Sequence, residues 1–303
     1  MTEACAKTVL LTGIHGQLGA ELLRQFGPEV RVVGLDRSAL NLADPDAIRQ
    51  AVRQVRPSVI VNPAAYTAVD KAETDRDTAY AVNATAPAIL AEEARALDAL
   101  LIHYSTDYVF DGTLDRPYRE SDATNPRSVY GASKRAGEEG IVASGARHLI
   151  LRTSWVVGSH GGNFAKTMLR LAGERDALRV VADQHGVPTS TRLLAEVTRA
   201  FLNRDRDQFE SGVYHVVPSG ATTWFDYARF VLGEAEAAGR SLRCRADQVA
   251  AITTAEYPLP APRPANSRLS TDKLSAALGI TLPPWQHGVS AVLQQLFKEA
   301  THA

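Results

Sequence analysis

The sequence has little cysteine, almost no net charge and no long hydrophobic run. Its two cysteines, Cys5 and Cys244, lie far apart and indicate neither a disulfide framework nor a zinc site. A formal net charge of −1 without a long basic run argues against a dedicated nucleic-acid-binding protein. No segment approaches the roughly 18 apolar residues of a membrane span, and the apolar run near the N-terminus is too short for a signal peptide. We therefore expect a cytoplasmic protein that binds neither nucleic acid nor membrane.

The first half of the chain alternates short β-branched runs with longer helical patterns. This alternation is typical of a parallel sheet covered by helices. Strands, some with the turn that follows them, are expected over 8–13, 30–36, 57–65, 100–106, 148–158 and 212–220. Helices are expected over 16–26, 45–55, 83–97, 130–144, 163–174, 190–203 and 223–238, and a Pro-rich loop over 258–270.

These patterns predict an α/β protein with a Rossmann-type doubly wound parallel sheet and a smaller C-terminal α/β substrate domain. We place an NAD(P)-binding domain at 1–160, with 180–215 returning to it. The substrate-binding domain is placed at 161–179 and 216–303.

A glycine-rich turn stands between the first strand and the first helix. Gly13, Gly16 and Gly19 have the spacing G-x-x-G-x-x-G, and such glycines permit a tight turn and close approach to a pyrophosphate. Asp36 ends the second strand, where an acid binds the adenosine ribose and favours NAD. Arg37 follows and is suited to the extra phosphate of NADP. The alternatives are a turn without ligand and a plain loop carboxylate, and the choice between NADH and NADPH stays open.

Tyr130 and Lys134 lie four residues apart on a predicted helix. The spacing alone is common on solvated helices, but Thr106 ends a predicted strand at the edge where ligands bind in open α/β sheets. A ketone that accepts hydride must also gain a proton, which a tyrosine phenol can donate. We expect the Lys134 ammonium to lower the pKa of Tyr130 and to bond the nicotinamide ribose, and Thr106 to orient the carbonyl.

Longer motifs add to this pair and resemble one family. They are GIHGQLG at 13–19, NPAAYTAVDKAE at 62–73, STDYVFDG at 105–112 and RPANSRL at 263–269. Together they resemble the dTDP-4-dehydrorhamnose reductases, in the extended short-chain dehydrogenase/reductase superfamily. The resemblance implies an oxidoreductase that uses NADPH or NADH to reduce the C4 ketone of dTDP-4-dehydrorhamnose. The product would be dTDP-L-rhamnose, in the last step of dTDP-rhamnose biosynthesis.

The resemblance also implies site residues. Cofactor contacts are expected from Gly16, Gln17 and Leu18 at the phosphates, Asp36 at the ribose, Asn41 and Leu42 near the adenine, and Ala64, Ala65 and Tyr66 along the middle. Substrate contacts are expected from Thr106, Asp107 and Trp155. Arg263 and Asn266 lie in the Pro-rich loop and suit recognition of a diphosphate or sugar.

Four of these residues could have a purely structural role or no function. Asp107 could be a turn cap, Trp155 a core aromatic, and the loop carrying Arg263 and Asn266 a surface loop without function. The histidines at 15, 103, 185 and 287 are read as structural, because no two share metal-ligand spacing.

Some members of the family hold Mg²⁺ with glutamates at a dimer interface. Arg192 stands where an acid would be needed, so we predict no metal and leave a homodimer open.

The same motifs leave four competing functions open. One is another sugar-nucleotide reductase of the same superfamily. A sugar-nucleotide epimerase would hold its cofactor tightly. A dehydratase would need a second acid after Thr106, where this chain has Asp107 followed by Tyr108. A non-catalytic regulatory subunit of a methionine adenosyltransferase shares the fold and would bind a partner instead.

Overall fold

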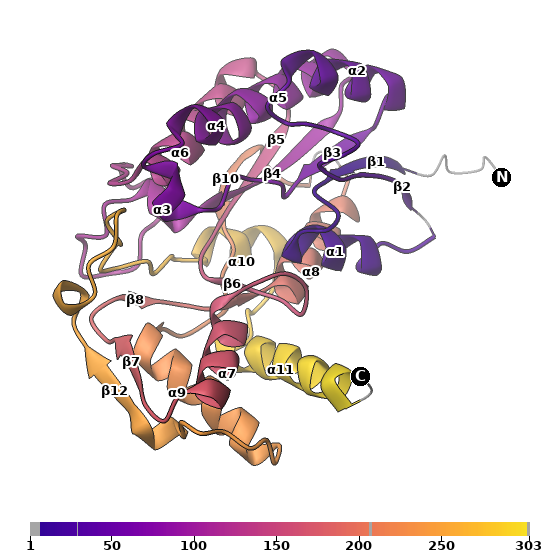
Figure 1. The fold of residues 1–303 in the computed structure, drawn as a ribbon. Coiled ribbons are helices and arrows are strands. Elements are labelled where there is room, and N and C mark those ends of the chain that lie inside the picture. Colours follow the sequence, from indigo (N-terminus) through magenta and orange to yellow (C-terminus); the bar gives the residue numbers. More distant parts are fainter. Residues whose placement is uncertain (1–6, 29, 206–207, 302–303) are drawn as a thin grey trace.

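The computed structural model describes residues 7–28, 30–205 and 208–301, so Cys5 lies outside the described residues. A six-stranded sheet lies at its centre, with all neighbouring strands parallel in the order β10-β5-β4-β3-β1-β2 (Figure 1). The strands are β1 (Lys7–Thr12), β2 (Val30–Leu35), β3 (Val59–Asn62), β4 (Leu100–Thr106), β5 (His148–Thr153) and β10 (Gly212–His215). The predicted Rossmann-type parallel sheet is confirmed.

The strand order reverses between β1 and β3. The chain runs outward from β1 to β2, and then returns to the other side of β1 to form β3. Ligands of open α/β sheets bind at the carboxyl ends of the strands at such a switch point. The glycine-rich turn follows β1 and Thr106 ends β4, so the topology brings both motifs to this edge.

Alternating side chains of the strands supply two cores, one on each face of the sheet. Val9 and Leu11 of β1 face one side, and Leu10 faces the other. The first face is covered by α1 (Gln17–Gln25), α8 (Thr191–Leu202) and α10 (Asp272–Leu278). The second is covered by α2 (Pro45–Val55), α5 (Ala86–Ala96) and α6 (Val129–Ser144). Figure 1 shows these helices above and below the sheet.

A third core lies in the lower part of Figure 1, built around Phe110, Tyr227 and Trp285. Its helices are α7 (Phe164–Glu174), α9 (Trp224–Ala237) and α11 (Trp285–Thr301). Three two-stranded pairs complete this part: β6 (Val156–Val157) with β9 (Thr189–Ser190), β7 (Leu178–Val181) with β12 (Val249–Ile252), and β8 (His185–Gly186) with β11 (Thr222–Thr223).

Some elements differ from the sequence-based expectations. The strand expected over 148–158 divides into β5 and β6, because Trp155 between them has a positive φ of 45°. The helix expected from residue 83 is preceded by a π-helical turn at Ala81–Thr85. Two short helices, α3 (Val69–Ala72) and α4 (Arg76–Tyr80), were not expected, and neither were α10 and α11.

The elements within 180–215 pack in two different places. Within 180–215, α8 packs against α1 and β10 pairs with β5. The end of β7 instead pairs with β12 in the lower part. Residues of α10, from the range assigned to the substrate-binding domain, pack on the sheet. No helix among the described residues is both long enough and apolar enough to cross a membrane.

Candidate active site

The glycine-rich turn is shaped by close backbone approaches. Gly13 has a positive φ of 62° and donates its N–H to Leu35 O at 2.7 Å, and a Cβ there would lie 2.9 Å from Ala64 Cβ. A Cβ on Gly19 would lie 2.1 Å from Gly13 O, so only glycine permits this helix–turn contact. Gly16 is exposed and caps α1 without a side-chain hydrogen bond. The first N–H groups of α1 are therefore available to a phosphate, and the turn fits a dinucleotide.

Asp36 presents a fixed negative charge just after β2. Its Oδ1 accepts hydrogen bonds from Ser38 Oγ at 2.7 Å and from the backbone N–H groups of Ser38 and Ala39, both at 2.9 Å. The Ser38 hydroxyl is the largest of the causes that lower the pKa of Asp36 to about 2. Its Oδ2 lies 3.2 Å from His15 Nε2, and Arg37 beside it is exposed. The carboxylate suits ribose hydroxyls, and the guanidinium suits a ribose phosphate.

The side chains of Gln17 and Leu18 have different surroundings. The Gln17 Oε1 accepts hydrogen bonds from Gly158 N and Asn163 Nδ2, both at 3.0 Å, and so joins the turn to the loop before α7. The Leu18 side chain is buried in the core of the sheet. Leu18 can therefore face a cofactor only through its backbone.

Ala64, Ala65 and Tyr66 follow β3, beside the glycine-rich turn. All three are partly exposed. The backbone of Tyr66 is held by one side chain, since its N–H donates to Asn83 Oδ1 at 2.8 Å and its carbonyl accepts from Asn83 Nδ2 at 3.0 Å. Its hydroxyl donates to Asp75 at 3.0 Å. The segment is thus rigidly placed along the edge that the cofactor would follow.

Asn41 and Leu42 lie further along the loop after β2. Asn41 is exposed, and its Oδ1 accepts from Ala43 N at 3.1 Å. Leu42 is partly buried against the core that α2 covers. Their role near an adenine stays a prediction.

Tyr130 lies in the first turn of α6 and meets Thr106 from the end of β4. Ser128 caps this helix by accepting a hydrogen bond from Gly131 N at 3.1 Å. Burial raises the pKa of Tyr130 to about 12; a hydrogen bond with Thr106 lowers it, and the Asp107 carboxylate raises it. The phenol is therefore protonated at neutral pH and ready to donate its proton.

Lys134 lies one turn further along α6 and is buried. Its Nζ donates to Tyr104 O at 2.6 Å and lies 3.0 Å from His103 Nε2. Burial lowers the pKa of Lys134 to about 8, against the opposing attraction of Glu138. Burial dominates the pKa of Tyr130 in this structure and raises it above the ordinary value, and the lowering by Lys134 expected from the sequence stays a prediction.

Asp107 begins a 3₁₀ turn (Asp107–Val109) directly after β4. Its Oδ1 accepts from Thr106 Oγ1 at 3.0 Å, while Oδ2 is buried without a partner among the described residues. Burial raises the pKa of Asp107 to about 6, against the lowering influence of the nearby Ser267 and Thr106 hydroxyls. A buried carboxylate oxygen without a partner is costly unless a ligand satisfies it, which suits a sugar hydroxyl.

The Trp155 side chain packs against the third core and is partly buried. Its ring stacks on Trp224 with centroids 3.6 Å apart and planes 16° apart. Gly186 also packs closely against the indole ring. A Cβ at this position would lie only 2.5 Å from Trp155 Cζ2. With its positive φ, Trp155 has the strained, fixed geometry that ligand-clamping residues show.

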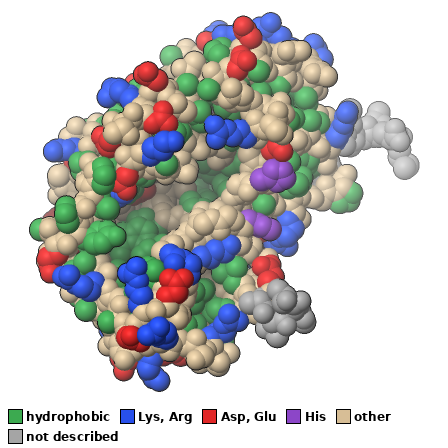
Figure 2. Space-filling model, viewed as in Figure 1, with side chains coloured by type: hydrophobic (Ala, Val, Ile, Leu, Met, Phe, Trp, Pro, Cys, Tyr) green, Lys and Arg blue, Asp and Glu red, His purple; other side chains and the backbone are tan. Residues whose placement is uncertain are grey.

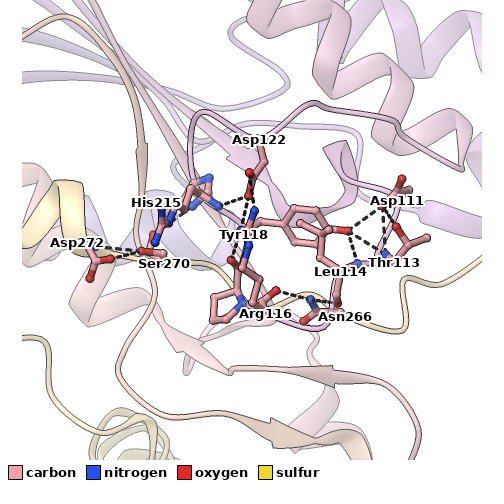
Figure 3. A network of polar contacts seen from close by, with 12 residues as sticks. Asp111, Thr113, Leu114, Arg116, Tyr118, Asp122, His215, Asn266, Ser270 and Asp272 are labelled. Carbon is pink, nitrogen blue, oxygen red and sulfur yellow. Dashed lines mark hydrogen bonds and ion pairs between the residues drawn. The ribbon is translucent and has the colours of Figure 1, made fainter.

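Arg263 and Asn266 are occupied by protein partners. Arg263 forms an ion pair with Asp70 at 2.6 Å. Asn266 donates from Nδ2 to the carbonyls of Leu114 at 2.7 Å and Arg116 at 2.8 Å (Figure 3). In this structure both side chains fasten the Pro-rich loop to the first half of the chain, and a ligand would have to compete for them.

Two buried polar residues at the site were not assigned a role from the sequence. His103 contacts Lys134, and Asn62 contacts His103 at 3.1 Å. They come from different strands, so no local spacing connects them. The sequence signal that could have pointed to them is the polar residue that each of these apolar strands contains.

The surface is hollowed between the sheet layer and the lower part, with hydrophobic side chains inside the hollow (Figure 2). Two other cavities, of about 440 Å³ and 610 Å³, are lined by residues such as Arg170 and Phe297, and Glu120 and Lys273. Neither cavity is lined by a candidate site residue. The position of the candidate residues themselves therefore locates the site at the carboxyl ends of the strands. The described residues hold no group of three or more His, Cys, Asp or Glu placed to bind a metal.

Comparisons with known proteins agree with this geometry. The family model of the RmlD substrate binding domain matches residues 7–298. The chain is 45% identical over 301 residues to dTDP-4-dehydrorhamnose reductase of Salmonella typhimurium, covering 97% of this chain and 99% of that protein. It is 46% identical over 297 residues to the protein of the same name from Escherichia coli K12, covering 95% and 98%.

A solved structure is similar over the same length. It is dTDP-4-dehydrorhamnose reductase from Bacillus anthracis in complex with NADP, with a TM-score of 0.87 and 34% identity over 97% of this chain and 99% of that one. The strand-end site and these full-length similarities lead to one conclusion: the chain belongs to the dTDP-4-dehydrorhamnose reductase family.

Proposed function

We propose that this protein reduces the C4 ketone of dTDP-4-dehydrorhamnose to give dTDP-L-rhamnose, with NADPH or NADH as reductant. The observation that carries the proposal is the meeting of Tyr130 and Thr106 at the end of β4, next to the turn that fits a dinucleotide. The relatives named above carry the activity in their names. The Bacillus anthracis structure holds NADP.

Cofactor binding is assigned to the carboxyl ends of β1, β2 and β3. A bound nicotinamide cofactor supplies the hydride. The glycine-rich turn and the N-terminus of α1 face its phosphates, and Asp36 with Arg37 faces the adenosine ribose. Ala64 to Tyr66 line its middle. The fixed charge of Asp36, with its pKa lowered to about 2, holds ribose hydroxyls at every physiological pH.

Proton delivery is assigned to Tyr130. The ketone oxygen gains negative charge as hydride arrives, and the phenol proton moves to it. Because burial and the Asp107 charge keep the pKa of Tyr130 at about 12, the phenol is protonated before each reaction. Thr106 contacts the phenol and orients the carbonyl, while Lys134 fixes the nicotinamide ribose.

Substrate recognition is assigned to Asp107 and Trp155. The Oδ2 of Asp107 lacks a protein partner among the described residues and is suited to a sugar hydroxyl. The indole of Trp155, stacked on Trp224, offers a rigid apolar surface to the sugar or base. The domain division, the cytoplasmic location and a homodimer stay predictions.

A direct assay tests the proposal. The purified protein is mixed with a dTDP-4-keto-6-deoxy sugar, its epimerase and NADPH or NADH, and loss of reduced-cofactor absorbance is followed. We expect cofactor oxidation that depends on the keto sugar, with dTDP-L-rhamnose as the product identified by mass spectrometry and NMR. The corresponding UDP-linked keto sugar serves as a control for the nucleotide. If no 4-keto sugar nucleotide oxidises either cofactor, the reductase assignment is wrong.

A further inference from the structure

A chain of hydrogen bonds lies beneath the candidate active site, and the steps above do not use it. Thr12 Oγ1 at the end of β1 lies 2.6 Å from Asn62 Oδ1 at the end of β3. Asn62 Nδ2 lies 3.1 Å from His103 Nδ1 on β4, and His103 Nε2 lies 3.0 Å from Lys134 Nζ. All four residues are at most 1% exposed. This buried series of hydrogen bonds thus runs across the adjacent strands β1, β3 and β4 and ends at Lys134.

The direction of donation along this chain depends on the charge of Lys134. An ammonium group only donates, so His103 Nε2 must then accept and the ring proton lies on Nδ1. Nδ1 must then donate to Asn62, which has to present its carbonyl oxygen. With Asn62 Nδ2 toward the ring, the ring proton lies on Nε2 and faces Lys134, which can accept only as a neutral amine. A half-turn of the Asn62 amide converts one arrangement into the other.

We propose that His103 and Asn62, with Thr12 at the far end, are positioning residues that set the protonation state of Lys134. They do so by selecting one of the two directions of donation, and the inference rests on the proposed role of Lys134. In the direction with the amide oxygen toward the ring, His103 and Tyr104 O together hold the ammonium group. In the other, the lysine is a neutral amine at the same position.

The charged groups near Lys134 do not by themselves fix the direction of donation along this series of hydrogen bonds. Glu138, one turn after Lys134, is already paired with Arg152 of β5 through bonds of 2.8 and 2.6 Å, and Arg135 lies 3.7 Å from it. Burial lowers the pKa of Lys134 to about 8 and that of His103 well below its usual value, so the imidazole is neutral. Further titratable groups of the adjoining segments are Tyr104, Tyr130, Asp107 and Tyr108, whose ring contacts that of Tyr130.

Lysine titration by NMR tests the proposal without any substrate. The chain has six lysines, so with ¹³Cε-labelled lysine the Lys134 signal is assigned from its absence in Lys134→Arg. His103→Phe removes the acceptor of the ammonium group, and we expect the pKa of Lys134 to fall by about one unit or more. Asn62→Asp offers an acceptor oxygen to the ring in both rotamers, and we expect the pKa to rise by about one unit.

His148→Phe is the matched control, because His148 is a buried imidazole on β5 whose Nδ1 lies 2.8 Å from Ala146 O. It should leave the Lys134 titration unchanged. Equal shifts in His103→Phe and His148→Phe, or a fall in Asn62→Asp, would overturn the proposal. If His103→Phe does not fold, the direction of the shift in Asn62→Asp decides. If the Lys134 pKa falls in His103→Phe and rises in Asn62→Asp but the reductase assay fails, only the proposed function is rejected.

Discussion

The two ends of the candidate site hold their ionisable groups in opposite ways. At the cofactor end, Asp36 is partly exposed and accepts hydrogen bonds from Ser38 and Ala39, and its pKa is lowered to about 2. At the catalytic end, burial raises the pKa of Asp107 to about 6 and lowers that of Lys134 to about 8. Hydrogen bonds fix charge at one end, and desolvation opposes charge at the other.

This difference matches what each end has to do. A ribose-binding carboxylate works as a permanent acceptor, and local hydrogen bonds keep it ionised. At the catalytic end, burial brings the pKa values of Asp107 and Lys134 toward the working pH, whereas it raises that of Tyr130 and keeps the phenol protonated. The following predictions test this contrast.

The largest effect is expected from the phenol at the catalytic end. Tyr130→Phe should lower kcat by about 10²–10⁴-fold, because the reduced ketone loses its proton donor, while the Kd of the cofactor stays nearly constant. Steady-state assays and cofactor fluorescence measure the two quantities. Tyr214→Phe is the control, since its buried hydroxyl donates to Glu210 O away from the site. Similar losses of kcat in both variants would contradict the assignment of Tyr130.

The glycine-rich turn at the cofactor end should be the next most sensitive. Gly19→Ala would place Cβ 2.1 Å from Gly13 O and displace the turn. We expect the free energy of unfolding to fall by about 1–3 kcal/mol and the cofactor Kd to rise clearly. Gly173→Ala, in an exposed turn of α7 with nothing within 4 Å of its Cβ, is the control and should be neutral or stabilising. Urea unfolding and fluorescence titration measure both effects.

The raised pKa of Asp107 predicts a stability that depends on pH. Its folded-state pKa of about 6 exceeds the ordinary 3.8, so the folded chain holds this proton more tightly. This contribution to the free energy of unfolding is present below about pH 4 and is lost as the pH rises through 6, by up to about 3 kcal/mol. Asp107→Asn should therefore gain stability relative to wild type between pH 4 and pH 7. A pH-independent difference in urea unfolding would argue against this.

The smallest effect is expected from an exposed charge at the cofactor end. Arg37→Ala should raise KM for NADPH by about two- to fivefold and leave KM for NADH unchanged, because only NADPH carries the extra phosphate. Arg31→Ala, an exposed guanidinium on β2, is the control. An equal change for both cofactors would remove Arg37 from the ribose-phosphate site.

Local patterns were enough to predict several elements of the sheet layer, among them the strand that ends at Thr106. The helix over 45–55 and the strand over 100–106 have the predicted bounds. For the helix, the reason is local, because Asp44 accepts hydrogen bonds from the N–H groups of Asp46 and Ala47 beside Pro45. The roles of Arg263 and Asn266 could not be judged in the same way. Arg263 pairs with Asp70, 193 residues away in the chain, and no local pattern reports such a partner.

The sequence by itself determined the parallel sheet, the glycine-rich turn and the placing of Tyr130 and Lys134 on one helix after the Thr106 strand. Periodicity, glycine spacing and helix geometry are local properties of the chain. Only the tertiary structure decided the direction of the pKa shifts, the contact of Lys134 with His103 and Tyr104, and the unpaired oxygen of Asp107. These depend on burial and on partners from other strands, which exist only once the sheet has assembled.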